Sequence, residues 1–208
     1  MKKRYLAGLA CGVMMLGMGG VASANPVTLV DQSSVWQYSV LTNDLWPNWG
    51  DAGYSSFNWN NASWQTRQAA FGNSTVAGLP VNTTWTANTD LALQKTFNIG
   101  GLLTAPITLN VASDNGFIVF INGNQVAKQN AEGFTSQWEY TLGLTDSAFL
   151  SPGVNTIQVL AEDHGGATFF DLKLTGNVES APVPEPATML LMGTGLAGLL
   201  GARRKKKK

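Results

Sequence analysis

Between Asn25 and Pro182 the sequence contains no cysteine, no methionine and a single histidine, His164. The one cysteine of the chain, Cys11, lies near the N-terminus, so no disulfide can stabilise this stretch and core packing must hold its fold. A single histidine without a cysteine argues against a zinc site. The stretch also has no Gly-x-Ser-x-Gly segment, so His164 lacks the nucleophile that a catalytic triad requires. We therefore expect no catalytic residues.

Charge is also scarce, and it is unevenly distributed. Charged residues make up 12% of the 208 residues, about half the usual share. The formal net charge is zero, yet between Asn25 and Pro182 it is 4 − 12 = −8, because most basic residues stand at the two ends. A domain with that charge repels phosphate, which excludes nucleic acid as a partner. The four basic residues in the stretch are Arg67, Lys95, Lys128 and Lys173.

Residues 1–24 have the layout of a secretory signal peptide. Basic residues 2–4 precede an apolar run over 5–21, and small residues then stand at Ala22 and Ala24. We expect signal peptidase to cleave after Ala24 during export. A retained N-terminal membrane anchor is the alternative.

The C-terminal end combines an extended linker, an apolar segment and a block of cations. Alternating prolines keep residues 179–186 extended, and residues 187–202 are uncharged and mostly apolar. Sixteen residues make a helix of about 24 Å, which is short for a hydrocarbon core of about 30 Å. The cations from Arg203 and Arg204 through Lys205 to residue 208 should stay cytoplasmic, so we expect a membrane helix with the acidic domain outside the inner membrane.

Three features of this end occur together and in order. Val183, Pro184, Glu185 and Pro186 precede the apolar segment, and the cations follow it. This combination resembles a PEP-CTERM sorting signal. The resemblance implies a Gram-negative bacterium, transient anchoring, processing by an exosortase and transfer to the cell surface or to an extracellular polysaccharide matrix. A plain single-span anchor is the alternative.

Residues 25–178 show the period-two alternation of β-strands rather than a helical stripe. Turn-forming Asp114-Asn115-Gly116 and Asn122-Gly123-Asn124 segments permit the positive φ angles of tight hairpins. Residues 43–90 are looser, and we expect long loops with one or two short strands there. Strands this frequent favour an all-β fold, namely a jelly-roll β-sandwich. The alternating sets are Ile107-Leu109-Val111, Phe117-Val119-Ile121, Trp138-Tyr140-Leu142, Ile157-Val159-Ala161 and Phe170-Leu172-Leu174.

The strand-rich half is similar to galactose-binding-domain-like jelly rolls. That resemblance implies carbohydrate binding, cell adhesion or a structural role, so the fold does not settle the ligand. It also places Trp64 in the core and implies a structural calcium ion in some members. The segments that carry the resemblance are Leu93–Phe97, Ser113–Val126, Leu150–Ile157 and Phe170–Leu172.

Tryptophans beside amides and acids are the residues that bind sugars, because an aromatic face packs on the C–H face of a sugar ring. Trp46, Trp49 and Trp59, together with Asp51, are therefore our ligand candidates. Tryptophan is also a usual core residue.

Calcium is the cation that loop carboxylates and carbonyls could hold. A sandwich could bring Asp31, Glu162, Asp163 and Asp171 together, although no EF-hand spacing occurs. We otherwise expect Glu162 and Asp163 to be solvated, and His164 to occupy a strand-to-strand loop.

The sequence thus predicts a non-enzymatic, exported surface or matrix protein that binds extracellular polysaccharide. The alternative from another class is a structural or adhesive protein that self-associates or binds protein.

Overall fold

The computed structural model describes residues 24–42, 57–60, 62–130, 132–144 and 148–179. All of them belong to one compact unit, Ala24–Glu179. The predicted signal-peptide helix and C-terminal helix lie outside the described residues. Within the described ranges, no helix is both long and apolar enough to cross a membrane.

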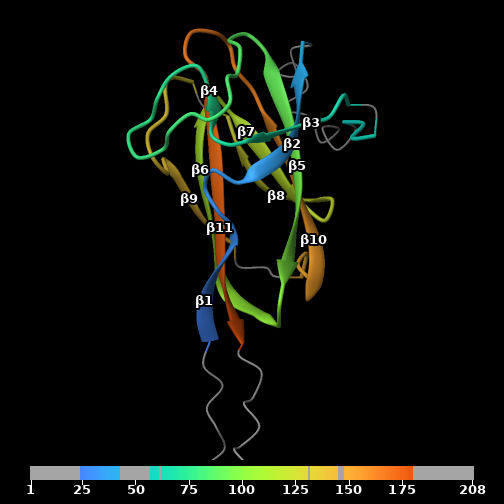
Figure 1. The fold of residues 1–208 in the computed structure, drawn as a ribbon. Helices are drawn as coiled ribbons and strands as arrows, with labels where there is room; N and C mark the ends of the chain where they lie inside the picture. Colours follow the sequence, from blue (N-terminus) through green and yellow to red (C-terminus); the bar gives the residue numbers. More distant parts are fainter. Residues whose placement is uncertain (1–23, 43–56, 61, 131, 145–147, 180–208) are drawn as a thin grey trace, which may run out of the picture. The chain divides into compact units, whose positions relative to one another are not determined.

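The described residues form two antiparallel sheets (Figure 1), which confirms the predicted all-β sandwich. The five-stranded sheet has the order β1 (Ala24–Val30), β11 (Phe169–Glu179), β6 (Leu103–Asp114) and β9 (Tyr140–Leu144), with β4 (Phe71–Gly72) paired to β11. The six-stranded sheet has the order β3 (Gln65–Gln68), β2 (Val35–Leu41), β5 (Asp90–Ile99), β10 (Gly153–Ala161), β7 (Phe117–Ile121) and β8 (Asn124–Gln129).

The main core lies between the sheets and follows the alternation seen in the sequence. Every second residue of β5, β6, β10 and β11 points inward, as period two requires. Each fully buried aliphatic side chain contributes about 1.5–3 kcal/mol of transfer free energy, so this layer stabilises a domain that has no disulfide. Its inward residues include Leu91, Leu93, Leu109, Val111, Ile157, Val159, Leu172 and Leu174.

One predicted hairpin is confirmed and the other is wrong. Asn122 and Gly123 have φ angles of 49° and 80° and join β7 to β8 within one sheet. The Asp114-Asn115-Gly116 segment instead leads from β6 in the five-stranded sheet to β7 in the other sheet. Because the chain changes sheets there, the Asn115 N–H donates to the Glu162 carbonyl at 2.7 Å rather than closing a hairpin.

Trp138 also departs from the predicted alternation. It has a φ of 51° and precedes β9, so it is not in register with Tyr140 and Leu142. Its ring packs with the cluster that contains Phe169, whereas Tyr140 and Leu142 pack with the main core. The left-handed backbone at Trp138 breaks the period-two pattern.

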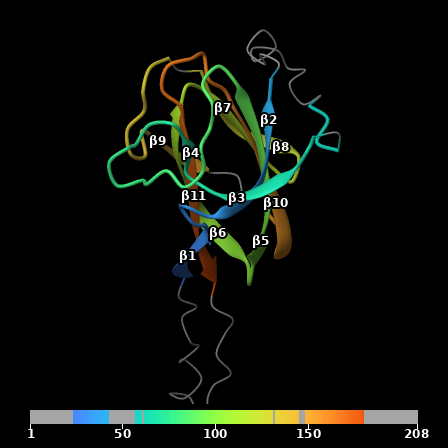
Figure 2. The same cartoon turned by 45° about the horizontal axis from the view of Figure 1, so that its top comes forward.

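Strand β2 changes partners along its length. Its first four residues, Val35 to Tyr38, pair with β3, and its residues from Gln37 onward pair with β5. Figure 2 shows β2 lying beside β3 at its start and then turning to run beside β5. On the N-terminal side of Gln37, β2 is therefore no longer paired with β5.

Both outer faces of the sandwich are partly covered. The outer face of the six-stranded sheet carries buried Ile118, Phe120 and Leu160, over which the aromatic residues 57, 59 and 64 pack.

The chain enters and leaves the domain at one point, because Ala24 is the register partner of Glu179. In Figures 1 and 2, β1 and β11 accordingly end side by side.

Candidate functional site

Three glutamines form a row across the outer face of the six-stranded sheet. Gln37 of β2 is in register with Gln94 of β5, which is in register with Gln158 of β10. Gln94 Nε2 donates to Gln37 Oε1 at 3.0 Å, and Gln158 Nε2 donates to Gln94 Oε1 at 3.4 Å. Among the described residues, the Gln37 amide Nε2 and the Gln158 Oε1 have no further hydrogen-bond partner. We call these three residues the glutamine row.

An aromatic cluster adjoins this row. Phe120 of β7 is the register partner of Gln158, so it continues the row toward β8. The Trp59 ring meets the Phe120 ring edge-on, with centroids 6.3 Å apart. Trp59 also lies parallel to Trp64, at 6.2 Å between centroids and 3° between planes, and edge-on to Phe57 at 4.7 Å.

The two tryptophans are held in this arrangement by the backbone and by the sheet. Trp64 Nε1 donates to the Trp59 carbonyl at 3.1 Å, which closes the short segment between them. Both side chains are half-buried, because they pack on the apolar outer face near Ile118 and Leu160 while keeping part of their surface in solvent. The face thus combines flat aromatic surface with hydrogen-bonding amides, which is the composition that sugar rings require.

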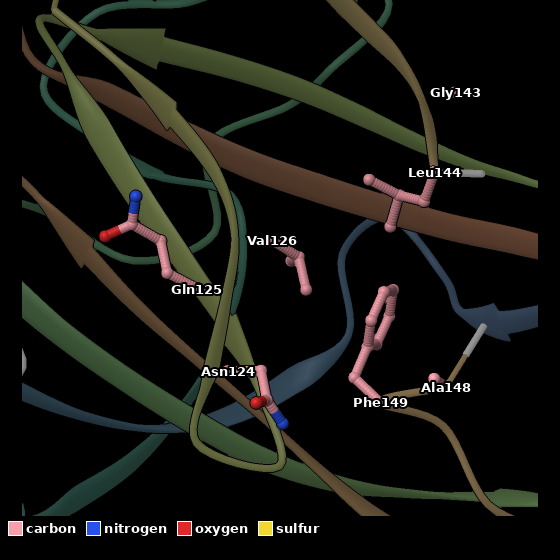
Figure 3. A pocket seen from close by; sticks show the side chains of 7 residues that line it. All are labelled: Asn124, Gln125, Val126, Gly143, Leu144, Ala148 and Phe149. Atoms are coloured by element: carbon pink, nitrogen blue, oxygen red, sulfur yellow. The ribbon is translucent and has the colours of Figure 1, made fainter. Parts of the chain in front are cut away.

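A separate cavity of about 530 Å³ lies beside β8 and the end of β9 (Figure 3). In Figure 3 the side chains of Val126, Leu144 and Phe149 face one another, while Gln125 points away from them. These three apolar side chains belong to or pack against the main core. We therefore interpret this cavity as the edge of the core rather than as the ligand site.

Acidic residues gather where β6 and β10 end. Glu162 and Asp163 are 0% and 4% exposed, so the expectation that they are solvated is wrong. They follow the last residue of β10 and turn inward with the chain, so strand alternation does not govern them. Asp163 Oδ2 accepts the Asn88 N–H at 2.6 Å and the Gly165 N–H at 2.9 Å, while burial raises the pKa of its carboxyl.

His164 occupies the loop between β10 and β11, as the sequence predicts. Its Nδ1 lies 2.9 Å from Glu132 Oε1, and its Nε2 lies 3.6 Å from Glu162 Oε2. Its backbone N–H donates to Asn115 Oδ1 at 2.9 Å, and Asn115 Nδ2 donates to Glu132 Oε2 at 3.1 Å. These contacts connect three loops at this end of the sandwich.

The four acids proposed for calcium do not gather at one place. Asp171 lies on β11, where its carboxylate accepts the Ser33 N–H at 3.2–3.3 Å. Asp31, in the turn between β1 and β2, lies near Asp171. Glu162 and Asp163 lie instead in the loop after β10. Across the described part of the chain, no three His, Cys, Asp or Glu side chains are grouped to hold a metal ion. The four candidates therefore do not fit a single calcium site.

Asp114 makes the stability of the domain dependent on pH. Burial, followed by the charges of Asp163, Glu132 and Glu139, raises its pKa from 3.8 to about 6. Because the folded state holds this proton more tightly than the unfolded state, the contribution of Asp114 to stability is full below about pH 4 and is lost as the pH rises through about 6. We expect Asp114→Asn to add ~1–2 kcal/mol to the free energy of unfolding at pH 7.5 and to change it little at pH 4.

Urea unfolding at the two pH values measures this difference. Glu179→Gln, which removes one exposed carboxylate at the end of β11, is the control and should show no such pH dependence. An equal gain at both pH values would show that the charge of Asp114 is not the cause.

The structure describes only part of the predicted ligand set. Trp46, Trp49 and Asp51 lie outside the described residues, as do the sorting motif and the cations. Trp59 is described, and it pairs with Trp64, which the sequence assigns to the core. The glutamine row was not predicted. A signal for it exists in the sequence, since Gln94 and Gln158 each occupy the outward positions of an alternating run.

Comparison with known proteins identifies the C-terminal end. Residues 182–205 match the PEP-CTERM protein-sorting motif, which confirms that prediction. The motif indicates export, a C-terminal membrane anchor before processing, and processing by an exosortase. No curated protein matches the chain.

Solved structures resemble the sandwich. One is a β-glucuronidase from Ruminococcus gnavus in complex with D-glucuronic acid, with 10% identity and a TM-score of 0.46. Another is a β-glucuronidase from an uncultured Clostridium species, with 7% identity and a TM-score of 0.45. Each match covers 76% of this chain, which spans about 30% of the length of those structures. Likeness at this identity concerns the fold alone.

Proposed function

We propose that this exported protein resides at the cell surface or in the extracellular matrix, where its sandwich binds polysaccharide without catalysis. The observation that carries the proposal is the outer face of the six-stranded sheet, where the Trp59–Trp64 pair adjoins the glutamine row. Aromatic rings pack on sugar C–H faces, and amides exchange hydrogen bonds with sugar hydroxyls. The sorting motif supports the location, because it indicates export and processing by an exosortase.

The accessibility of the acids supports a non-catalytic role. A glycosidase needs two carboxyl groups that flank the scissile bond of its substrate. Asp114, Glu162 and Asp163 are at most 4% exposed, and the exposed Glu132 contacts His164, so this cluster does not present a pair of accessible carboxyl groups. His164 contacts Glu132 and Glu162 and so connects loops instead of activating a nucleophile.

A structural or adhesive protein that self-associates is the second candidate. Its support is a set of exposed apolar side chains, of which Val35 and Val154 are 52% and 71% exposed on the outer face of the six-stranded sheet. These valines lie on β2 and β10, with β5 between them, so they do not form one contiguous patch. Single exposed apolar side chains are common on soluble proteins, which favours the polysaccharide proposal.

Trp59→Ala tests the proposal. We expect it to weaken polysaccharide binding by about tenfold or more, because buried aromatic anchors dominate binding energy and tenfold corresponds to about 1.4 kcal/mol. The full chain, purified in detergent, would be titrated against the exopolysaccharide of its host by calorimetry. Gln158→Ala leaves the ring cluster intact and should weaken binding by about twofold to tenfold, as the loss of one neutral hydrogen bond predicts.

The matched control is Trp138→Ala. Trp138 is also partly buried, but it packs against a cluster that includes Phe169, away from the glutamine row. The Trp138→Ala substitution should leave polysaccharide binding unchanged. Equal losses in the Trp59 and Trp138 variants would show general destabilisation, and concentration-dependent assembly without binding would favour the self-associating protein.

A further inference from the structure

The separation of β2 from β5 opens a pocket in the six-stranded sheet. On the N-terminal side of Gln37, residues Val35 and Trp36 of β2 pair with β3 only. On the facing part of β5, Lys95 and Thr96 pair only with β10. The resulting opening, which we call the fork, encloses about 520 Å³, a size that accommodates one or two sugar rings. Figure 2 shows the divergence of the two strands. The fork is lined by Val35, Trp36, Gln37, Thr66, Gln94, Lys95, Thr96 and Thr156.

The lining combines apolar Val35 and Trp36 with polar and basic side chains, and none of the described residues in it is acidic. Gln37 and Gln94 of the glutamine row also line the fork, and Thr96 and Thr156 add hydroxyl groups to its lining. Trp36 is 1% exposed, and its indole Nε1 has no hydrogen-bond partner among the described residues. A buried donor of this kind costs free energy unless a ligand or water satisfies it.

Lys95 supplies the charge of the fork. Its ammonium crosses the opening and donates to the Val35 carbonyl at 3.1 Å. The Lys95 side chain is partly buried, and this burial lowers the pKa of its amine. Among the described residues, no carboxylate lies within ion-pair distance of Lys95. A partly desolvated ammonium without a counter-charge favours an anionic ligand.

The distribution of cations supports the same conclusion. Only four lysines and arginines stand between residues 25 and 182, where the net charge is −8. Lys95 lines the fork, whereas Arg67 of β3, the register partner of Trp36, follows the lining residue Thr66 but does not itself line the opening. The Arg67 guanidinium donates to the Thr66 carbonyl at 3.1 Å, so it too is held by a backbone carbonyl. Lys95 thus gives the fork one positive charge on an otherwise acidic domain.

We infer that the fork binds the carboxylate of a uronic acid unit within the polysaccharide chain. The Lys95 ammonium pairs with the carboxylate, and the amides of Gln37 and Gln94 bond the ring hydroxyls. The remaining sugars of the chain extend along the glutamine row toward Trp59. This inference rests on the polysaccharide binding proposed above and specifies the chemical class of the polymer.

Lys95→Gln tests the inference with alginate, a polyuronate, and with carboxyl-reduced alginate, its neutral counterpart. We expect the full chain in detergent to bind alginate at least about tenfold more tightly than the reduced polymer, as a charge-assisted hydrogen bond implies. Lys95→Gln should remove this preference, and Lys95→Arg should retain it. The preference of the unmodified protein should also decrease with added salt.

The control is Lys173→Gln, which removes the same charge from β11 in the other sheet. It should leave the preference unchanged, and the melting temperatures of all variants should remain close to that of the unmodified protein. Equal affinity for the two polymers, or an unchanged preference in Lys95→Gln, overturns the inference while polysaccharide binding stands. If neither polymer nor the host exopolysaccharide binds, the proposed function fails as well.

Discussion

Replacing Trp85 by alanine is expected to lower the free energy of unfolding by about 3–5 kcal/mol. Trp85 is fully buried in the main core, and its indole N–H donates to the Thr89 carbonyl at 2.9 Å. Its own carbonyl accepts the Thr168 hydroxyl at 2.8 Å. Removal of the ring therefore leaves both a cavity and an unpaired Thr89 carbonyl. Domains of this size have about 5–15 kcal/mol in total, and here no disulfide compensates for the loss.

Urea unfolding of the full chain in detergent measures this loss. Trp85→Phe keeps most of the apolar volume but loses the indole donor, so its cost should be clearly smaller than that of alanine. If the two substitutions cost the same, the lost hydrogen bond rather than the cavity dominates. An alanine variant that unfolds at the same urea concentration as the unmodified protein would contradict the central position of Trp85.

The second large effect concerns export. Replacement of Pro184, Glu185 and Pro186 by alanine should abolish processing by the exosortase, because these residues supply the Pro-Glu-Pro sequence within the matched range 182–205. The apolar segment and the cations would remain, so the unprocessed protein should accumulate in the inner membrane. Immunoblots of membrane and surface fractions from the native host would show the larger form and the loss of the processed one.

Glu179→Ala is the control for this experiment. Glu179 is an exposed acid at the end of β11, outside the motif, so its replacement should leave processing intact. Normal release of the triple variant would show that processing does not depend on these three residues. A host strain that lacks the exosortase should reproduce the behaviour of the triple variant.

The strands could be predicted because burial imposes period two on the sequence. Leu91 and Leu93 on β5, and Ile157 and Val159 on β10, alternate with outward residues and are all fully buried. The exceptions occur where the backbone leaves strand geometry. Trp138 has a left-handed φ, and Glu162 follows the end of its strand, so neither obeys the alternation.

Turn chemistry was less informative than periodicity. Asn122-Gly123 and Asn115-Gly116 have the same residue types, yet the first closes a hairpin and the second leads between sheets. The local sequence specifies a change of direction, but the partner of the next strand depends on packing across the whole domain. A jelly roll contains both kinds of connection, so similar segments meet different fates.

The candidate site was harder to predict than the fold, because it depends on register between distant strands. Gln37 and Gln94 are 57 positions apart, and Gln94 and Gln158 are 64 apart, yet their side chains are hydrogen-bonded. Nothing in the three local segments indicates this alignment. The fork likewise arises where β2 changes partners from β3 to β5, and no residue of β2 predicts this change. Trp59, in contrast, could be predicted as a ligand candidate, because it is a tryptophan with amide neighbours in the sequence.

The position of β11 has a mechanical consequence. Sequence beyond Glu179 continues from this strand, which lies inside the five-stranded sheet between β1 and β6. A pull on the C-terminal tail along the strand axis would load the backbone hydrogen bonds to both neighbours at once, in shear. An edge strand pulled in the same direction would load the hydrogen bonds to a single neighbour only. A protein tethered through its C-terminal end while its other sheet holds a polymer would therefore resist tension as a unit.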